Sequence, residues 1–155
     1  MNSRRQMLSR SARVAAALAA AGALPGIAFA QSGGWNKAAF EAKTMAELMK
    51  ALGGSAPVES KEVTLTAPDI AENGAVVPVA VASSASGVRR MLVLVEKNPN
   101  VLAATFDVSD AVDASFGTRV KMGQSSNVYA VAMTADGKTL FAMKEVKVTL
   151  GGCGG

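Results

Sequence analysis

The sequence of 155 residues contains no histidine, a single cysteine and few aromatic residues, which make up 5% of the chain. Without histidine the chain cannot form a Ser-His-Asp triad, a Cys-His dyad or a histidine-ligated metal site. A single cysteine also excludes an internal disulfide and a cluster of thiolate ligands. An enzyme that acts alone is therefore the function class that the sequence favours least.

The N-terminal 30 residues have the pattern of an export signal. Arg4 and Arg5 belong to a 13-residue segment with four arginines and no acidic residue, and an Ala/Leu-rich stretch follows over residues 14–24. Ala28-Phe29-Ala30 then matches the small-residue site at which signal peptides are cleaved. The apolar run is shorter than the roughly 20 residues that span a bilayer, so we expect no stable membrane insertion.

The segment Ser3-Arg4-Arg5-Gln6-Met7-Leu8 resembles a twin-arginine export signal. We therefore expect residues 1–30 to be a signal peptide that directs the chain to the periplasm and is cleaved near Ala30. Cleavage would remove four of the 16 basic residues and none of the 12 acidic ones, leaving 12 of each sign. The formal charge of +4 then belongs to the signal, and nothing in the charge balance favours a nucleic-acid partner.

Residues 31–150 have the pattern of one folded domain. Met45, Leu48, Met49 and Leu52 recur at helical spacing, Thr44-x-x-Glu47 reads as a capping box, and Gly53-Gly54 supplies a helix stop. An earlier turn around Trp35, Ala39 and Phe40 is expected to pack in the same way. These apolar positions are interpreted as core packing.

From Ser60 onward apolar residues alternate with polar ones, which is the period of β-strands. We expect about seven short strands, and they are predicted at residues 63–67, 75–82, 88–96, 101–108, 115–122, 128–134 and 139–150. Pro78 demands an edge position or a bulge, and Ala135-Asp136-Gly137-Lys138 predicts a tight hairpin. Evenly spaced strands without intervening helices predict an all-β, immunoglobulin-like antiparallel β-sandwich.

The C-terminal segment carries the most distinctive chemistry. The chain ends Gly151-Gly152-Cys153-Gly154-Gly155, so the only cysteine stands between two glycine pairs. Glycines hold no fixed backbone and add no bulk, which predicts a slender flexible arm over residues 151–155 that reaches at most about 17 Å. No histidine is available to activate the thiol, so we interpret Cys153 as a handle that other enzymes act on.

The export signal, the single cysteine, the terminal Gly-Gly-Cys-Gly-Gly and the stretch from Pro68 to Val79 together resemble the SoxY family of sulfur-carrier proteins. The resemblance implies a heterodimer with SoxZ, a second small β-sandwich protein, and covalent carriage of sulfur intermediates on Cys153. The cytochrome SoxAX would attach thiosulfate, the hydrolase SoxB would release sulfate, and the sulfur dehydrogenase SoxCD, where present, would oxidise the remaining sulfur. This chain would itself bind no metal, haem or other cofactor.

Several other features have plainer interpretations. Asp107, Asp110 and Asp113 lack the spacing of a calcium loop and are interpreted as a solvated cluster. Arg89-Arg90 could bind a sulfonate, but neighbouring strand residues face opposite sides, which favours a surface role. The methionines are interpreted as strand-core filling and not as a copper site; they are Met91, Met122, Met133 and Met143. Glu72-Asn73-Gly74 is either a structural turn or part of a partner interface.

The alternative to a sulfur carrier is an exported β-sandwich interaction module whose exposed cysteine forms an intermolecular disulfide. A ubiquitin-like carrier activated at its terminal carboxylate is disfavoured, because that activation uses ATP in the cytosol. A prenylation box is disfavoured as well, since Cys-Gly-Gly is not C-a-a-X. An incidental cysteine in a disordered tail is the remaining interpretation.

Overall fold

The computed structural model describes residues 36–149. Within these residues the chain forms two short helices, α2 (Lys37–Glu41) and α3 (Met45–Leu52), and then only strands. The nine strands of this part are β1 (Val58–Glu59), β2 (Val63–Thr66), β3 (Ile70–Ala71), β4 (Val77–Ser83), β5 (Val88–Val95), β6 (Leu102–Asp107), β7 (Ser115–Val120), β8 (Ser126–Thr134) and β9 (Thr139–Val148).

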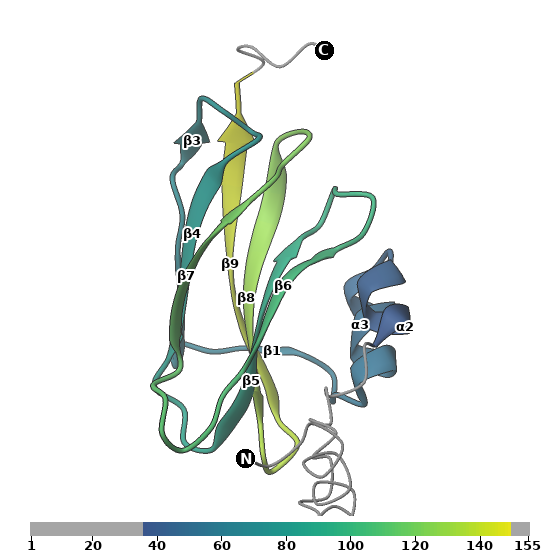
Figure 1. Ribbon diagram of the computed structural model, residues 1–155, viewed down its shortest axis with the longest axis vertical. Helices are drawn as coiled ribbons and strands as arrows, with labels where there is room; N and C mark the ends of the chain where they lie inside the picture. The colour runs from purple at the N-terminus through teal and green to yellow at the C-terminus, as the bar shows by residue number, and fades with distance from the viewer. Residues whose placement is uncertain (1–35, 150–155) are drawn as a thin grey trace, which may run out of the picture. The chain divides into compact units, whose positions relative to one another are not determined.

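The strands form two sheets that face each other, and the two helices lie on the far side of the larger one (Figure 1). The larger sheet has the order β1-β9-β8-β5-β6 with β3 also paired to β9, and the smaller sheet has the order β2-β4-β7. The predicted β-sandwich is confirmed. The structure differs from the prediction in having two additional strands of two residues each, β1 and β3. Both pair with β9 in parallel.

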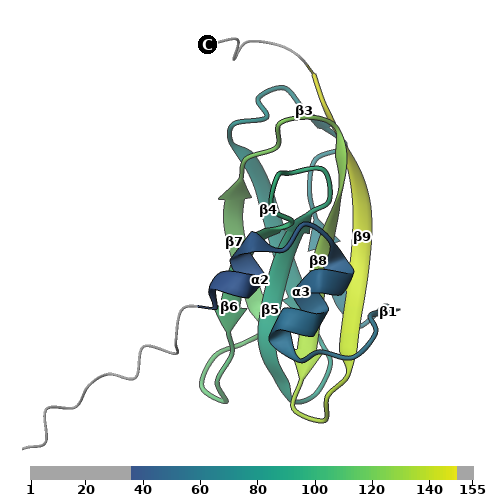
Figure 2. The same ribbon diagram turned by 90° about the vertical axis from the view of Figure 1, so that its right-hand side faces the viewer.

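The uninterrupted apolar run of β5 reflects burial on both faces of the larger sheet. Met91, Val93 and Val95 belong to the core between the sheets, whereas Leu92 and Leu94 belong to the core beneath the helices. All five side chains are at most 1% exposed. Figure 2 shows α2 and α3 in front of this sheet, and their cover explains why β5 is apolar on its outer side from Leu92 onward, beyond Arg89 and Arg90.

Helix α3 begins and ends at the residues that the capping pattern marks. The Thr44 hydroxyl accepts a hydrogen bond from the Glu47 backbone N–H at 3.2 Å, and the Glu47 carboxylate accepts one from the Lys43 backbone N–H at 2.8 Å. Gly53 ends the helix in the left-handed conformation, with φ of 69°. Leu48 and Met49 are buried against the sheet, whereas Trp35 lies outside the described residues.

Pro78 lies in β4, which is the central strand of the smaller sheet. The pairing of β2 with β4 ends where Thr66 faces Ala80, so Pro78 has a strand partner on one side only, Arg119 of β7. Proline lacks the backbone N–H that a second partner would require. Pro78 therefore lies at a local edge of the sheet, as expected, although β4 as a whole is the central strand.

The hairpin between β8 and β9 is stabilised by an ion pair that should depend on pH. The Lys138 ammonium and the Thr134 hydroxyl lower the pKa of Asp136 from 3.8 to about 2. A lowered folded-state pKa means that the contribution is present above about pH 4 and is lost as the pH falls towards 2. We expect Asp136→Asn to lower Tm by no more than a few degrees at pH 7, because the pair is exposed.

Thermal unfolding of the wild type and of Asp136→Asn at a series of pH values measures this effect. Most of the difference in Tm should be lost as the pH falls from 4 to about 2, and the remainder below that. A difference that is the same at pH 2 and pH 7 would contradict the assignment to the Asp136–Lys138 pair.

Candidate functional site

The residues of the predicted arm lie outside the described residues, and so do Arg4 and Arg5 of the predicted export signal. The arm residues are Gly151, Gly152, Cys153, Gly154 and Gly155. The structure describes the end of β9 and Thr149, which lead directly into this segment.

On one side, the end of β9 is held by β3. The Lys147 backbone N–H donates to the Asp69 carbonyl oxygen at 2.9 Å, and the Thr149 N–H donates to the Ala71 carbonyl oxygen at 3.1 Å. In this parallel pairing Ile70 faces Lys147 and Ala71 faces Val148. Strand β3 is thus a clasp of two residues on the outer edge of the last strand.

On the other side, the loop before β8 holds the same residues. The Ser125 hydroxyl oxygen accepts a hydrogen bond from the Val148 backbone N–H at 2.9 Å, and Ser126 pairs with Val146 in the sheet. The Val146 side chain is fully buried. The base of the C-terminal segment is consequently fixed from both sides up to Thr149.

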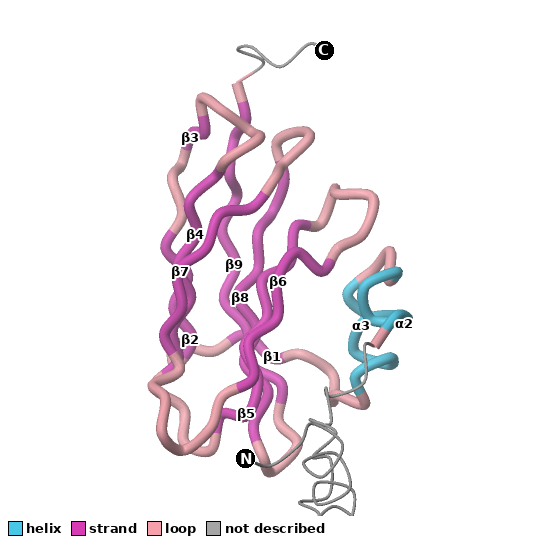
Figure 3. The backbone as a smooth tube through the Cα atoms, viewed as in Figure 1, coloured by secondary structure: helices cyan, strands magenta, loops and turns pink. Residues whose placement is uncertain are grey.

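Gly74 lies in the loop between β3 and β4, which is drawn in pink in Figure 3, and it closes the clasp by a close approach to the loop that contains Met122. Its carbonyl oxygen accepts a hydrogen bond from the Met122 N–H at 2.7 Å, and the Asn73 side chain accepts one from the Ala75 N–H at 2.9 Å. A Cβ atom at Gly74 would overlap the Met122 carbonyl oxygen and lie 2.8 Å from Val148 Cγ1. The turn at Glu72-Asn73-Gly74 therefore has a structural role at the base of the arm.

One pair of charged side chains near this base forms an ion pair. The Lys144 ammonium lies 2.9 Å from the Asp69 carboxylate and donates to the Ala67 carbonyl oxygen at 2.6 Å. Among residues 36–149 no group of three or more potential ligand side chains could hold a metal ion. In the same range, no helix has the length and apolar character needed to cross a membrane.

The two arginines form surface ion pairs with two of the three aspartates, Asp107 and Asp110. Arg90 Nε lies 2.6 Å from Asp107 Oδ1, and Arg89 Nη1 lies 2.9 Å from Asp110 Oδ1. A register shift between Val88 and Arg90 accompanies this arrangement. The aspartates neutralise the arginines, which agrees with the interpretation of both motifs as surface features.

One of the four methionines interpreted as core filling is not buried. Met91 and Met122 are at most 2% exposed and Met133 is half-buried, but Met143 is 49% exposed. Strand alternation places Met143 on the same face as Phe141, which packs in the core beneath the helices. The helix layer covers Phe141 and leaves Met143 uncovered, so the prediction for Met143 was wrong.

A hollow of about 430 Å³ lies at the margin of the helix layer. Burial, followed by the nearby Glu96 carboxylate, raises the pKa of the Tyr129 hydroxyl above its ordinary value of 10.0, so the hydroxyl stays neutral at physiological pH. None of the residues that line the hollow carries a thiol. It is lined by Lys43, Thr44, Met45, Leu94, Glu96, Val101, Tyr129 and Phe141.

Sequence reasoning missed Ser125 and the β3 clasp, which help to fix the base of the arm, and it identified Gly74 only as part of a turn that is either structural or at a partner interface. Two of them lie within the stretch from Pro68 to Val79 that carries part of the family resemblance. That stretch was the available signal, because an isolated glycine beside a turn indicates a close backbone approach. Ser125 gave no signal of its own.

Comparison with known proteins supports the resemblance. The chain is similar to the sulfur carrier protein SoxY of Chlorobium limicola f. thiosulfatophilum, with 33% identity and a TM-score of 0.61 over 68% of this chain and 94% of that one. It is also similar to a superoxide reductase (neelaredoxin) of Ignicoccus hospitalis, with 17% identity and a TM-score of 0.51 over 56% of this chain and 80% of that one. The second likeness shows the fold alone.

A comparison with curated proteins gave no match. The sequence model of the family described as "Sulfur oxidation protein SoxY" matches residues 48–153, which begin in α3, include every strand and end on the cysteine. Because this match covers more than half of the chain and agrees with the structural likeness, the chain belongs to the SoxY family of sulfur-oxidation carrier proteins.

Proposed function

We propose that this chain is a periplasmic carrier in thiosulfate oxidation that binds its cargo covalently on Cys153. The observation that carries the proposal is that the family match extends to residue 153, which is the only cysteine of the chain. The base of the proposed arm is held by β3 and Ser125 up to Thr149. The four residues from Thr149 to Cys153 can then place the thiol at most about 14 Å from a fixed point.

In the proposed reaction the chain supplies the thiol and the partner enzymes supply the catalysis. The Cys153 thiol loses its proton, its sulfur bonds to the outer sulfur of thiosulfate, and two electrons pass to the c-type cytochrome SoxAX. Water then attacks the sulfonate sulfur in SoxB, so that sulfate leaves and a persulfide remains on Cys153.

Where SoxCD is present, three water molecules supply oxygen to the outer sulfur and six electrons leave. Hydrolysis by SoxB then restores the thiol. The chain is proposed to pair with SoxZ, to bind no metal or haem of its own, and to be exported through the twin-arginine signal at Arg4 and Arg5. Covalent attachment keeps each reactive sulfur species from diffusing away between enzymes.

The intact mass of the mature protein from periplasm of cells grown on thiosulfate tests this function. We expect a set of sulfur, thiosulfonate or sulfonate adducts on Cys153, most of them removed by a thiol reductant. A single unmodified mass would contradict the carrier role. A clean disulfide dimer would instead support the alternative, an interaction module that its cysteine crosslinks.

A further inference from the structure

The outer face of the three-stranded sheet is uncovered in the described part of the chain. Strands β2, β4 and β7 turn their buried side chains towards the core between the sheets, and α2 and α3 pack on the other sheet. The outward positions form cross-strand rows, with Thr66, Ala80 and Gly117 in one row and Pro78 beside Arg119 in the next. We call this surface the β4 face.

The central strand of the β4 face carries no polar side chain at its outward positions, which are Pro78, Ala80 and Ala82. Sheet faces in contact with water usually carry polar side chains at alternate positions. On the β4 face Arg119 is the only charged residue among the outward positions of the three strands. These positions are Thr64, Thr66, Pro78, Ala80, Ala82, Ser115, Gly117 and Arg119.

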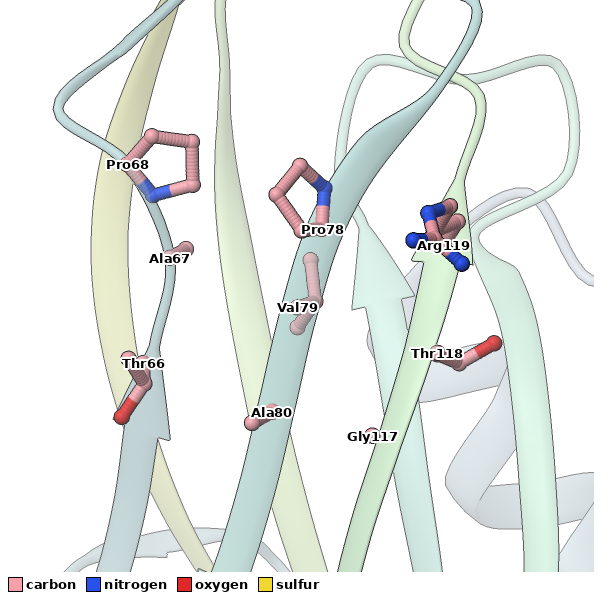
Figure 4. Close-up of a pocket in the computed structure, with 9 residues that line it drawn as sticks. All are labelled: Thr66, Ala67, Pro68, Pro78, Val79, Ala80, Gly117, Thr118 and Arg119. Carbon is pink, nitrogen blue, oxygen red and sulfur yellow. The ribbon is translucent and has the colours of Figure 1, made fainter.

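The middle of the β4 face is a shallow, mainly apolar hollow of about 590 Å³ (Figure 4). Pro68, Pro78 and Arg119 lie across its upper part in Figure 4, and Ala80 and Gly117 lie below them. Two large apolar side chains that are close to the hollow along the chain are also exposed. Ile70 is 57% exposed and Val76 is 49% exposed, and each is two residues from a proline of the hollow.

Gly117 is not required by the fold of the described residues. A Cβ atom there would meet nothing within 4 Å, and its φ lies outside the left-handed region. Glycine inside a strand weakens it, and it often marks a place where another backbone or a ligand comes close. A partner molecule that packs closely against this strand would explain why residue 117 is a glycine.

The β4 face also carries positive charge without a counter-charge. Arg89 and Arg90 each pair with an aspartate, whereas no carboxylate of residues 36–149 lies within 4.0 Å of the Arg119 guanidinium. The same holds for Lys121, two residues further along. A guanidinium with free donors is suited to a carboxylate on another molecule.

We propose that the β4 face docks a partner protein that places a bulky apolar side chain in the hollow over Gly117 and a carboxylate against Arg119. This inference rests on the proposed function, in which the carrier works as one subunit of a complex. The apolar hollow with its exposed margin supplies burial, and the unpaired cations supply orientation. Because β9 belongs to the other sheet, a partner on this face does not pack on the strand that leads into the arm.

Titration of the mature full chain with purified SoxZ, followed by sedimentation, tests the proposal. We expect Gly117→Phe, which fills the hollow, and Arg119→Glu, which reverses the charge, each to weaken binding at least about tenfold. Thr105→Phe on β6 and Lys50→Glu on α3 are the matched controls, since both positions are exposed and away from the face. The controls should bind as the wild type does.

Equal affinity of all four variants, or no binding by the wild type, would overturn the proposal. So would a self-associated form of the chain that Gly117→Phe dissociates, because a second copy would then be the occupant. Tighter SoxZ binding by a chain truncated after Thr149 than by the full chain would also overturn it, because residues 150–155 would then be the occupant of the hollow. The mass adduct on Cys153 is read separately, so failure of docking and failure of the carrier function can be told apart.

Discussion

Cys153→Ser is expected to abolish both the sulfur adducts and thiosulfate-dependent electron transfer to the cytochrome. A hydroxyl does not form the sulfur–sulfur bond that the first step requires, and the chain contains no second cysteine to take its place. Activity should therefore fall to the background of an assay without the carrier. The measurement is cytochrome reduction in the reconstituted system, together with the intact mass of the variant.

The fold should be unaffected by this substitution. Residue 153 lies beyond the last held residue, Thr149, and the cores of the domain are formed by residues of the described part. Thermal unfolding of Cys153→Ser should therefore match the wild type within about 0.5 kcal/mol. Loss of activity with unchanged stability assigns the effect to the thiol.

Met143→Leu is the matched control for sulfur chemistry elsewhere in the chain. Met143 is 49% exposed, and oxidation of its thioether would add oxygen that a thiol reductant does not remove. This variant should retain adducts and activity. Activity that survives Cys153→Ser, or adducts that disappear in Met143→Leu, would refute the assignment to Cys153.

Local sequence patterns predicted the elements of the sandwich because each pattern is set by neighbours along the chain. The capping residues Thr44 and Glu47 act within one helical turn, and the Asp136-Gly137 turn acts within one hairpin. The apolar run of β5 predicted a strand but not its surroundings. Burial on both faces arises from the helices on one side and the second sheet on the other.

The features that sequence reasoning missed depend on contacts between distant segments. Strands β1 and β3 have two residues each, which is too short for any periodicity to show. Met143 occupies an apolar position of an alternating strand, and only the extent of the helix layer decides its exposure. Ser125 meets Val148 across 23 residues of chain, so no local pattern could assign its role.

The candidate site likewise has one part that the sequence predicts and one part that it does not. Cys153 and its glycines could be recognised from composition and position alone, since a lone thiol among glycines is chemically distinctive. The base that holds the arm could not, because it joins residues near 70, 74, 125 and 148. Gly74 was visible only as one residue of a turn, although its close contact with Met122 and Val148 makes it critical.

Gly74→Val is expected to destabilise the domain by about 1–3 kcal/mol, the usual cost of forcing extra atoms into a packed site. The added side chain overlaps the Met122 carbonyl oxygen, which is backbone and cannot move aside cheaply, and it crowds Val148. The loop must therefore shift, which weakens the Met122–Gly74 hydrogen bond. Urea unfolding should show a lower midpoint with a similar slope.

Gly123→Val is the matched control, because a Cβ atom at this nearby loop glycine meets nothing within 4 Å. We expect its stability to lie within about 0.5 kcal/mol of the wild type. Equal stability of the two variants would show that the Gly74 contact does not hold the loops together.

Hydrogen exchange at the Val148 and Thr149 amides should speed up in Gly74→Val alone, because these amides are bound by Ser125 and β3. Since Cys153 remains in the variant, adducts should still form on it, which separates the role of Gly74 at the arm's base from the chemistry of the thiol.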